Sequence, residues 1–209
     1  MATPAHQNAW HYTHSPADGG EVARWQGSSA PALGCHFHRE AQLCCVLSGS
    51  RLFEVAGRHT HVLAGQCLLI PAGVPHRSLP HVHPGTQCVN LYTAATGASA
   101  AQPQLLPAQA LADRLPIAAI AAQAGLGRES FTRRFTQRVG MPPHAYRLAD
   151  RLNAARQRLR EGAVLAELAA ELGFADQSHL GRHFRRMFGT SPRAYRDSMG
   201  AGPPASQTF

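Results

Sequence analysis

Three features are missing from the sequence, and each absence excludes a class of protein. No apolar run approaches the ~18–20 residues that a membrane-spanning helix needs. Residues 1–20 are polar and rich in His, so they lack the apolar core of a signal peptide. The five Cys are an odd number, which does not indicate the disulfide framework of a secreted domain. These absences predict a cytoplasmic protein with reduced thiols and no membrane partner.

Lysine is absent altogether. The 20 basic side chains are all Arg, and against 12 acidic residues they leave a net charge of +8. Residues 1–104 hold 5 Arg and 4 acids, a net charge of +1, whereas residues 105–209 hold 15 Arg and 8 acids, a net charge of +7. A basic half of this kind suits a polyanion such as DNA. A solvated surface rich in Arg would have the same composition, so charge alone leaves both interpretations open.

Turn residues and hydrophobic periodicity divide the chain into two predicted domains. Short apolar runs broken by Gly and Pro predict a β-sandwich or barrel over residues 21–95. Helical periodicity predicts an all-α domain over residues 105–199, and a linker composition separates the two at 96–104. Residues 1–20 are expected to be a flexible leader and 200–209 a disordered tail. The linker is too short for a long coiled coil, so a homodimer would have to use the barrel face.

The predicted elements have definite ranges. The apolar runs that we expect to be strands are 43–47, 52–55, 67–70 and 89–92. The predicted helices are 117–124, 128–139, 143–160, 165–172, 177–188 and 192–198. Pro143 and Pro192 are placed in the first turns of two of these helices, where a missing N–H is not needed.

The helical half contains one pattern twice. The segment AAQAGL at 121–126 is repeated as AAELGF at 169–174, 48 positions later, and the match then continues at a spacing of 49. The matched pairs in that continuation are Phe131 and Leu180, Arg133 and Arg182, Phe135 and Phe184, Gly140 and Gly189, Pro143 and Pro192, and Tyr146 and Tyr195. A helix, a Gly turn and a second helix, given twice, predict two DNA-reading units and a gene regulator rather than an enzyme.

The second helix of each unit has an apolar face and an Arg face. Phe131 and Phe135 are four apart and share a side of the helix, whereas Arg133 lies roughly 200° around it. The predicted DNA-binding residues are Arg128, Glu129, Ser130, Thr132 and Arg133 in the first unit and Gln177, Ser178, His179, Arg182 and Arg185 in the second. Glu129 precedes Arg133 by four residues, so the two could pair with each other instead of DNA, and the first unit would then read its site less stringently.

The second copy resembles the signature of the AraC/XylS family of transcription regulators. Its sequence from Leu172 to Arg196 is LGFADQSHLGRHFRRMFGTSPRAYR, and the resemblance covers about residues 105–198. It implies a regulator that binds a double-stranded promoter site and contacts RNA polymerase, with activation favoured over repression. The first copy departs from the family at Gly127, where a polar cap is usual, and at Glu129.

Two stretches of the N-terminal half resemble the cupin motifs. His36, His38, Gln42 and Gly49 follow H-x-H-x3-E-x6-G, and residues 65–76 follow G-x5-P-x-G-x2-H and end at His76. The resemblance implies a small cupin barrel, which is a frequent sensor domain in this regulator family. Gln42 departs from the family, since cupins have a metal-binding Glu at this position.

Side chains alternate between the two faces of a strand, and this alternation is expected to bring the candidate ligands together. His36 and His38 share a strand face, Gln42 and Cys44 point the same way, and His76 follows the Pro-Gly turn. Three imidazoles suit one divalent Zn, Ni, Cu or Fe ion, and the Cys44 thiol would either join them or line a ligand pocket. Two alternatives remain open: a bound metal, or a metal-free pocket for a small organic effector. The alternative function is a metal-dependent cupin enzyme, a dioxygenase or an isomerase, fused to the DNA reader.

Overall fold

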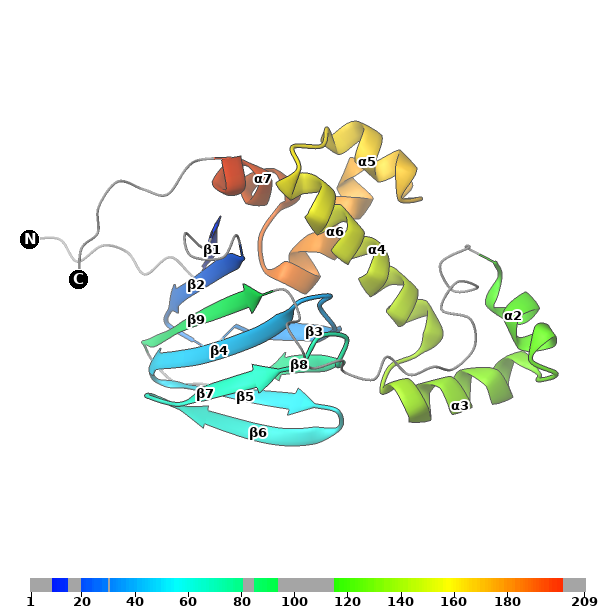
Figure 1. Cartoon of the computed structure of the whole chain (residues 1–209), viewed down its shortest axis with the longest axis horizontal. Helices are drawn as coiled ribbons and strands as arrows, with labels where there is room; N and C mark the ends of the chain where they lie inside the picture. The colour runs from blue at the N-terminus through cyan, green and yellow to red at the C-terminus, as the bar shows by residue number, and fades with distance from the viewer. Residues whose placement is uncertain (1–8, 15–19, 30, 81–84, 94–114, 201–209) are drawn as a thin grey trace, which may run out of the picture.

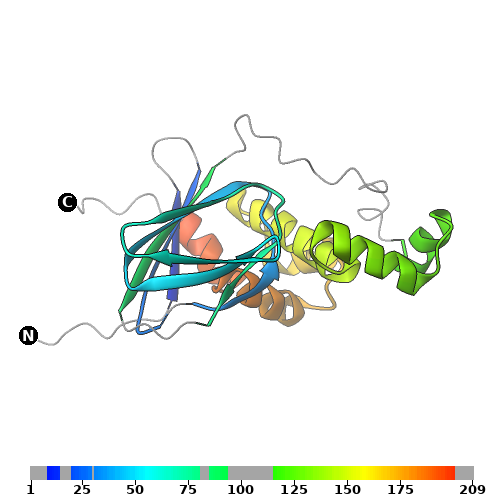
Figure 2. The same cartoon turned by 90° about the horizontal axis from the view of Figure 1, so that it is seen from below.

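The protein has a β half and a helical half that pack against each other (Figures 1 and 2). The structure is a computed structural model, and it describes residues 9–14, 20–29, 31–80, 85–93 and 115–200. Two antiparallel sheets, one of five strands and one of four, form the β half. The prediction of a small cupin barrel followed by an all-α domain is confirmed. No described helix is long and apolar enough to cross a membrane.

The two sheets share one core. The five-stranded sheet has the order β1-β2-β9-β4-β7, and the four-stranded sheet has the order β3-β8-β5-β6. The strands are β1 Ala9–His14, β2 Glu21–Gly27, β3 Leu33–His36, β4 Ala41–Ser48, β5 Ser50–Val55, β6 Arg58–Leu63, β7 Cys67–Ile70, β8 His76–Leu79 and β9 Thr86–Thr93. Burial alternates along β4, where Gln42, Cys44 and Val46 point inward, as the period of two predicts for a sheet with one covered face.

Strand β1 corrects the prediction of a flexible leader over residues 1–20. It pairs with β2 along its whole length, and its Trp10 and Tyr12 are buried. Tyr12 donates a hydrogen bond of 2.6 Å to the carbonyl oxygen of Phe188 in the helical half. Only two large apolar residues mark this strand in a polar stretch, so its sequence signal is weak, and the core that covers them comes from distant parts of the chain.

The described helices follow the predicted ranges closely. They are α2 Ile117–Gln123, α3 Arg128–Val139, α4 Pro143–Arg160, α5 Leu165–Glu171, α6 Gln177–Phe188 and α7 Pro192–Gly200. Both Pro residues begin helices as expected. The predicted linker 96–104, the segment 105–114 and the predicted tail beyond Gly200 lie outside the described residues.

A disulfide corrects the prediction that all thiols are reduced. Cys45 and Cys67 are direct cross-strand partners in β4 and β7, with Cα atoms 4.1 Å apart, and their sulfur atoms are bonded. Cys35, Cys44 and Cys88 are free. Pairing depends on the register between two strands, and this register brings together residues that are 22 positions apart in the chain.

The glycine that ends each second helix contacts the β half. Gly140 and Gly189 both adopt the left-handed conformation, with φ of 87° and 73°, which suits glycine because it has no Cβ. A Cβ on Gly189 would lie 2.2 Å from the ring of Trp10, whereas one on Gly140 would lie 3.8 Å from Pro75. The second unit is therefore docked so closely on β1 that only glycine fits.

Candidate DNA interface and metal centre

Two helix-turn-helix units are present where the repeat predicts them. The first consists of α2 and α3, and the second of α5 and α6, with the 18-residue helix α4 between them. Phe131 and Phe135 are buried in the first unit, and Leu180 and Phe184 in the second. The apolar faces therefore anchor the helices, and the opposite faces are left for a ligand.

The outer face of α3 carries most of the predicted contacts of the first unit. Arg128, Glu129 and Arg133 are exposed, and Thr132 is half-buried; these four line a shallow surface hollow. The ion pairs of the described residues do not include one between Glu129 and Arg133. The intrahelical pair expected from their spacing is thus absent from this described helix, and both side chains are available to a partner.

The outer face of α6 carries Gln177, Ser178, Arg182 and Arg185, and all four are exposed. Asp176 caps the helix by accepting a hydrogen bond of 2.6 Å from the backbone N–H of His179. This polar cap is missing from the first unit, where Gly127 occupies the matching place and makes no side-chain cap.

His179 differs from the other predicted contacts because its ring is held within its own unit. The backbone N–H of Ala175 donates to its Nδ1 over 3.2 Å, and its Nε2 lies 3.0 Å from Nε2 of His183. The ring also stands edge-on to Phe174, with 5.5 Å between centroids. His179 thus shapes the start of the recognition helix, and its two ring nitrogens are already engaged.

The two halves meet at a buried ionic cluster that the sequence patterns did not reveal. Arg156 on α4 and Glu21 on β2 are both almost fully buried, and they form a two-armed ion pair. The hydroxyl of Tyr195 on α7 also donates to the Glu21 carboxylate. The guanidinium of Arg156 lies over the ring of Tyr92 on β9, 4.2 Å from its centroid. Removing either charge would leave the other buried and uncompensated, which is strongly destabilising.

Further polar contacts surround this cluster. Arg160 on α4 pairs with Glu40 at 2.7 Å, and Arg39 pairs with Asp150 at 2.7 Å. The side-chain amide of Asn153 donates to the carbonyl oxygen of Phe37 over 2.9 Å. Phe37, Arg39 and Glu40 flank His38 in the chain, so the end of the barrel that carries the His residues is the end that α4 covers (Figures 1 and 2).

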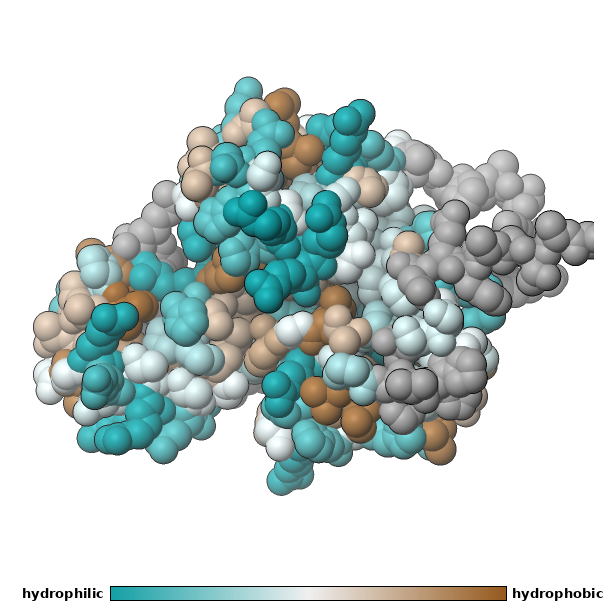
Figure 3. Space-filling model, turned by 180° about the vertical axis from the view of Figure 1, so that it is seen from behind, coloured by the Kyte–Doolittle hydropathy of each residue, from teal (hydrophilic) through white to brown (hydrophobic). Residues whose placement is uncertain are grey.

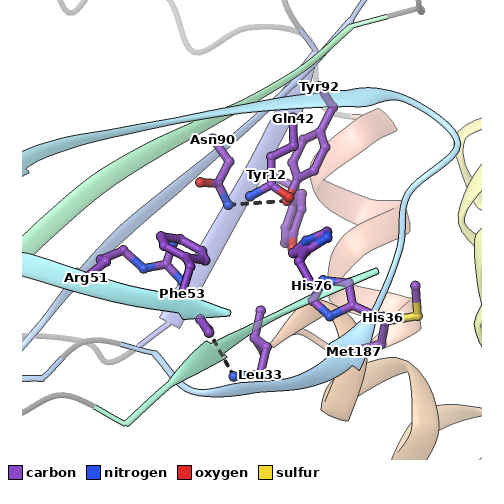
Figure 4. Close-up of a pocket in the computed structure, with 11 residues that line it drawn as sticks. Tyr12, Leu33, His36, Gln42, Arg51, Phe53, His76, Asn90, Tyr92 and Met187 are labelled. Atoms are coloured by element: carbon purple, nitrogen blue, oxygen red, sulfur yellow. Dashed lines mark hydrogen bonds between the residues drawn. The ribbon is translucent and has the colours of Figure 1, made fainter. Parts of the chain in front are cut away.

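The three predicted His ligands meet in the barrel. His36 ends β3, His38 follows it, and His76 begins β8. One ring nitrogen from each lies within 4.8 Å of those of the other two, and all three rings are buried. Figure 4 shows His36 and His76 beside Gln42 and Tyr92, around one small cavity. The three imidazoles therefore lie together, as motif spacing and strand parity predict, whereas Cys44, which parity also placed with them, is not part of this cluster.

The protonation of the rings suits a metal ion. Burial, together with the other imidazoles, holds the pKa of His36 and of His38 well below the usual 6.5, and burial lowers the pKa of His76 to about 4. All three are therefore neutral at pH 7, as metal ligands must be. Nδ1 of His36 lies 2.6 Å from the Gly34 carbonyl oxygen and Nδ1 of His76 lies 2.9 Å from that of Val74, so each Nδ1–H is anchored and each Nε2 keeps its lone pair.

Unpartnered polar atoms and a small volume also fit a metal ion. Nε2 of His76 and Oε1 of Gln42 are buried without a hydrogen-bond partner among the described residues, which is unfavourable unless something binds them. The cavity that both residues line has a volume of about 10 Å³. That is room for one water molecule or one ion, whereas pockets for organic ligands measure roughly 300–1,000 Å³.

Cys44 lies at a different part of the barrel interior. The three-His cluster does not include it; its sulfur lies 3.6 Å from Nη1 of Arg51, and so does the sulfur of Cys88. A hydrogen bond from the Cys88 thiol and the nearby guanidinium lower the pKa of Cys44 to about 7, against the opposing effect of burial. Arg51 is buried, and the described residues give it no carboxylate partner. The sulfur atoms of Cys44 and Cys88 are therefore the groups that face this buried cation.

Comparisons with known proteins agree with this division of the chain. Residues 120–198 match the family described as a helix-turn-helix domain, and residues 20–79 match the cupin domain. The HTH-type transcriptional regulator MtrA of Neisseria gonorrhoeae is 32% identical over 96 residues, 42% of this chain and 30% of that protein. The HTH-type transcriptional activator RhaS of Escherichia fergusonii is 37% identical over 84 residues, 40% of this chain and 30% of that protein.

A solved structure resembles both halves together. ToxT from Vibrio cholerae, solved with a bound unsaturated fatty acid, matches with a TM-score of 0.59 at 12% identity, over 96% of this chain and 100% of that one. This likeness concerns the fold. The matches to the curated relatives cover about a third of those proteins' length. Residues 120–198 therefore form a helix-turn-helix domain similar to that of AraC-like transcription regulators, and residues 20–79 form a cupin domain.

Proposed function

We propose that the protein is a sequence-specific DNA-binding transcription regulator. The observation that carries the proposal is the pair of helix-turn-helix units whose outer faces hold exposed Arg, in the half of the chain with a net charge of +7. Helix α4 would span about 27 Å at ~1.5 Å per residue. That length roughly suits two recognition helices in successive major grooves, ~34 Å apart. One molecule would then read two adjacent segments of one DNA face.

The test is binding to the DNA upstream of its own operon. Fluorescence anisotropy should give a Kd at least ~1,000-fold lower for that DNA than for a scrambled fragment at physiological salt. Equal affinity for both fragments, with a steep dependence on salt alone, would contradict a regulator and indicate a binder without specificity. Footprinting of the bound fragment should show two protected segments about one helical turn apart.

We also propose that the effector is one divalent transition metal held by His36, His38 and His76, with Gln42 as a neutral fourth donor. The fit of the site to an ion supports this over an organic molecule in the barrel. Elemental analysis of the purified protein should find about one Zn, Ni, Cu or Fe per chain. The metal should be lost in His36→Ala and His76→Ala and kept in His59→Ala, whose ring is exposed on β6. Retention of metal in all three variants would contradict the site.

A second candidate effector is an organic acid with an apolar tail, bound between the two halves. A cavity of about 200 Å³ lies there between β3, α4 and α6. Leu148, Leu152 and Met187 provide apolar walls, and His183 and Arg186 provide polar groups. ToxT, which shares the fold, was solved with an unsaturated fatty acid bound. Calorimetry with a monounsaturated fatty acid would distinguish the candidates: binding that Arg186→Ala abolishes and Arg193→Ala retains would favour the organic effector.

The remaining partners follow from the regulator proposal. The protein would bind promoters in the cytoplasm, contact RNA polymerase and act as an activator of transcription. A homodimer would use the outer face of the barrel, where Leu47, Leu63 and Leu69 are exposed. Sedimentation equilibrium of Leu69→Ser against the unchanged protein tests that contact. A cupin enzyme is disfavoured because the curated proteins that this chain resembles are transcription regulators.

A further inference from the structure

A chain of hydrogen bonds crosses from α4 into the three-His cluster. Arg156 donates from Nη1 to Nδ1 of His38 over 3.2 Å, and Nε2 of His38 lies 3.2 Å from Nε2 of His36. His36 then donates from Nδ1 to the carbonyl oxygen of Gly34 over 2.6 Å. The guanidinium sets the direction of every bond in this chain, because arginine has five donors and no acceptor.

The direction of the chain places the proton on each ring. Nδ1 of His38 accepts a hydrogen bond, so the single proton of this neutral imidazole is on Nε2, and Nε2 of His36 accepts it. The nitrogen of His38 that faces the other two rings therefore has no free lone pair. While Arg156 donates to Nδ1 of His38, Nε2 of His38 carries the proton and cannot bind a metal ion.

From this geometry we infer that the hydrogen bond from Arg156 to Nδ1 of His38 and metal ligation by His38 exclude each other. To ligate a metal ion through Nε2, His38 must carry its proton on Nδ1 instead. That proton would point at a guanidinium that can only donate, so Arg156 has to leave Nδ1. The proton on Nε2 passes to water and a proton from water joins Nδ1, so the ring stays neutral and no reactant beyond water is required. This inference rests on the proposed metal-binding function.

The consequence reaches the DNA-binding half, because Arg156 belongs to the helix that joins its two units. Arg156 keeps Glu21 as a partner on its other arm, so its release from His38 shifts the contact between α4 and the barrel without removing it. Metal binding and the docked state are then linked: whatever favours one disfavours the other by the same factor. An ion in the barrel thereby changes how freely the two reading units can adjust to DNA.

Zinc affinity of two matched variants tests the inference. Arg156→Gln and Arg160→Gln each remove one charge from α4, one helical turn apart, and both arginines pair with Glu21 and Glu40. Of the two, Arg156 is the one that contacts His38. We expect Arg156→Gln to bind Zn²⁺ about 10-fold more tightly than the unchanged chain and Arg160→Gln to stay within about 3-fold, whereas loss of an ordinary outer-sphere partner weakens binding ~10–100-fold. Equal tightening in both variants, or weakening in Arg156→Gln, would overturn the inference.

A measurement on the unchanged chain covers the case in which Arg156→Gln does not fold. Nitrogen-15 NMR of the imidazoles should show His38 protonated at Nε2 without metal and at Nδ1 with saturating Zn²⁺. A proton that stays on Nε2 after saturation would overturn the inference. If Zn²⁺ binds to none of the three proteins, the proposed metal site itself fails. If all three bind it equally, the metal site stands and only the coupling through Arg156 is lost.

Discussion

The two helix-turn-helix units come from one repeated pattern, yet they meet the rest of the molecule differently. In the second unit, the segment after α6 lies against β1, and the hydroxyl of Tyr195 is hydrogen-bonded to the buried Glu21. The matching residue of the first unit, Tyr146, is half-buried and stacks on Phe37 with 4.8 Å between centroids. The α2–α3 unit forms a separate lobe of the molecule (Figures 1 and 3).

This difference shows that the repeat specifies the fold of each helix-turn-helix unit but does not specify how the unit packs on the β half. Both copies keep the buried apolar face, the exposed Arg and the terminal Gly. What holds the second copy is the surface it meets, namely Trp10, Tyr12 and Glu21, which lie outside the repeat. The second unit packs directly on the cupin domain, through α6 on β3 and through the following α7 on β1, whereas α3 of the first unit packs mainly on α4.

Matched core cavities should separate the two units most strongly. Phe184→Ala and Phe131→Ala should each cost about 3–5 kcal/mol in the unit concerned, because each removes a fully buried ring. Both Trp residues of the chain lie in the β half, so their fluorescence follows the barrel during urea unfolding. The midpoint should fall in Phe184→Ala and stay unchanged in Phe131→Ala. Equal shifts would show that the first unit shares the same cooperative core.

The paired glycines offer the next largest contrast. Gly189→Ala should cost about 2–5 kcal/mol, since the new Cβ would both strain a left-handed residue and overlap the Trp10 ring. Gly140→Ala has the same strain, but its Cβ would make only an ordinary contact of 3.8 Å with Pro75, so about 1–2 kcal/mol is expected. Thermal unfolding of the two variants measures the difference. Identical losses would mean that Trp10 does not hold the second unit.

In the metal-free protein, acid should weaken the contact between the second helix-turn-helix unit and the β half. Burial lowers the pKa of His36, His38 and His76, so the unfolded chain binds protons that the folded protein does not. The free energy of unfolding should therefore be highest above pH 6.5 and should fall between pH 6.5 and about 4. His76 alone should account for ~3 kcal/mol of this fall. Hydrogen exchange should show α6 and α7 losing protection across that range before α3 does. A pH-independent exchange pattern would contradict the buried neutral cluster.

The smallest expected difference between the two units is in DNA affinity, which is the property closest to the proposed function. Arg182→Ala should weaken specific binding by about 1–3 kcal/mol if it reads a base. Arg133→Ala should weaken it less, because Glu129 beside it repels phosphate and the first unit lacks a polar cap. Arg193→Ala, on α7, serves as the control for loss of one exposed Arg. Equal losses on specific and random DNA would indicate that Arg182 only touches phosphate.

Much of the fold could be predicted because local patterns carry it. Helices α3, α4 and α6 begin and end at the predicted residues, since hydrophobic periodicity, first-turn Pro and terminal Gly act within a few residues of each boundary. The His cluster was also predictable, from motif spacing and strand parity. Strand β1 and the Cys45–Cys67 disulfide were not, because each depends on a partner strand that the sequence does not identify.

The sequence by itself determined the two halves, the duplicated reading unit and the three imidazoles, because each is recorded in a periodic or closely spaced pattern. Only the tertiary structure decided what those parts do to one another. Arg156 and Glu21 are separated by 135 positions and look like two ordinary surface charges in the sequence. Packing buries them together and brings the guanidinium against His38. The link between the two halves is therefore a product of docking, since burial strengthens the interaction of a charge with the few groups around it.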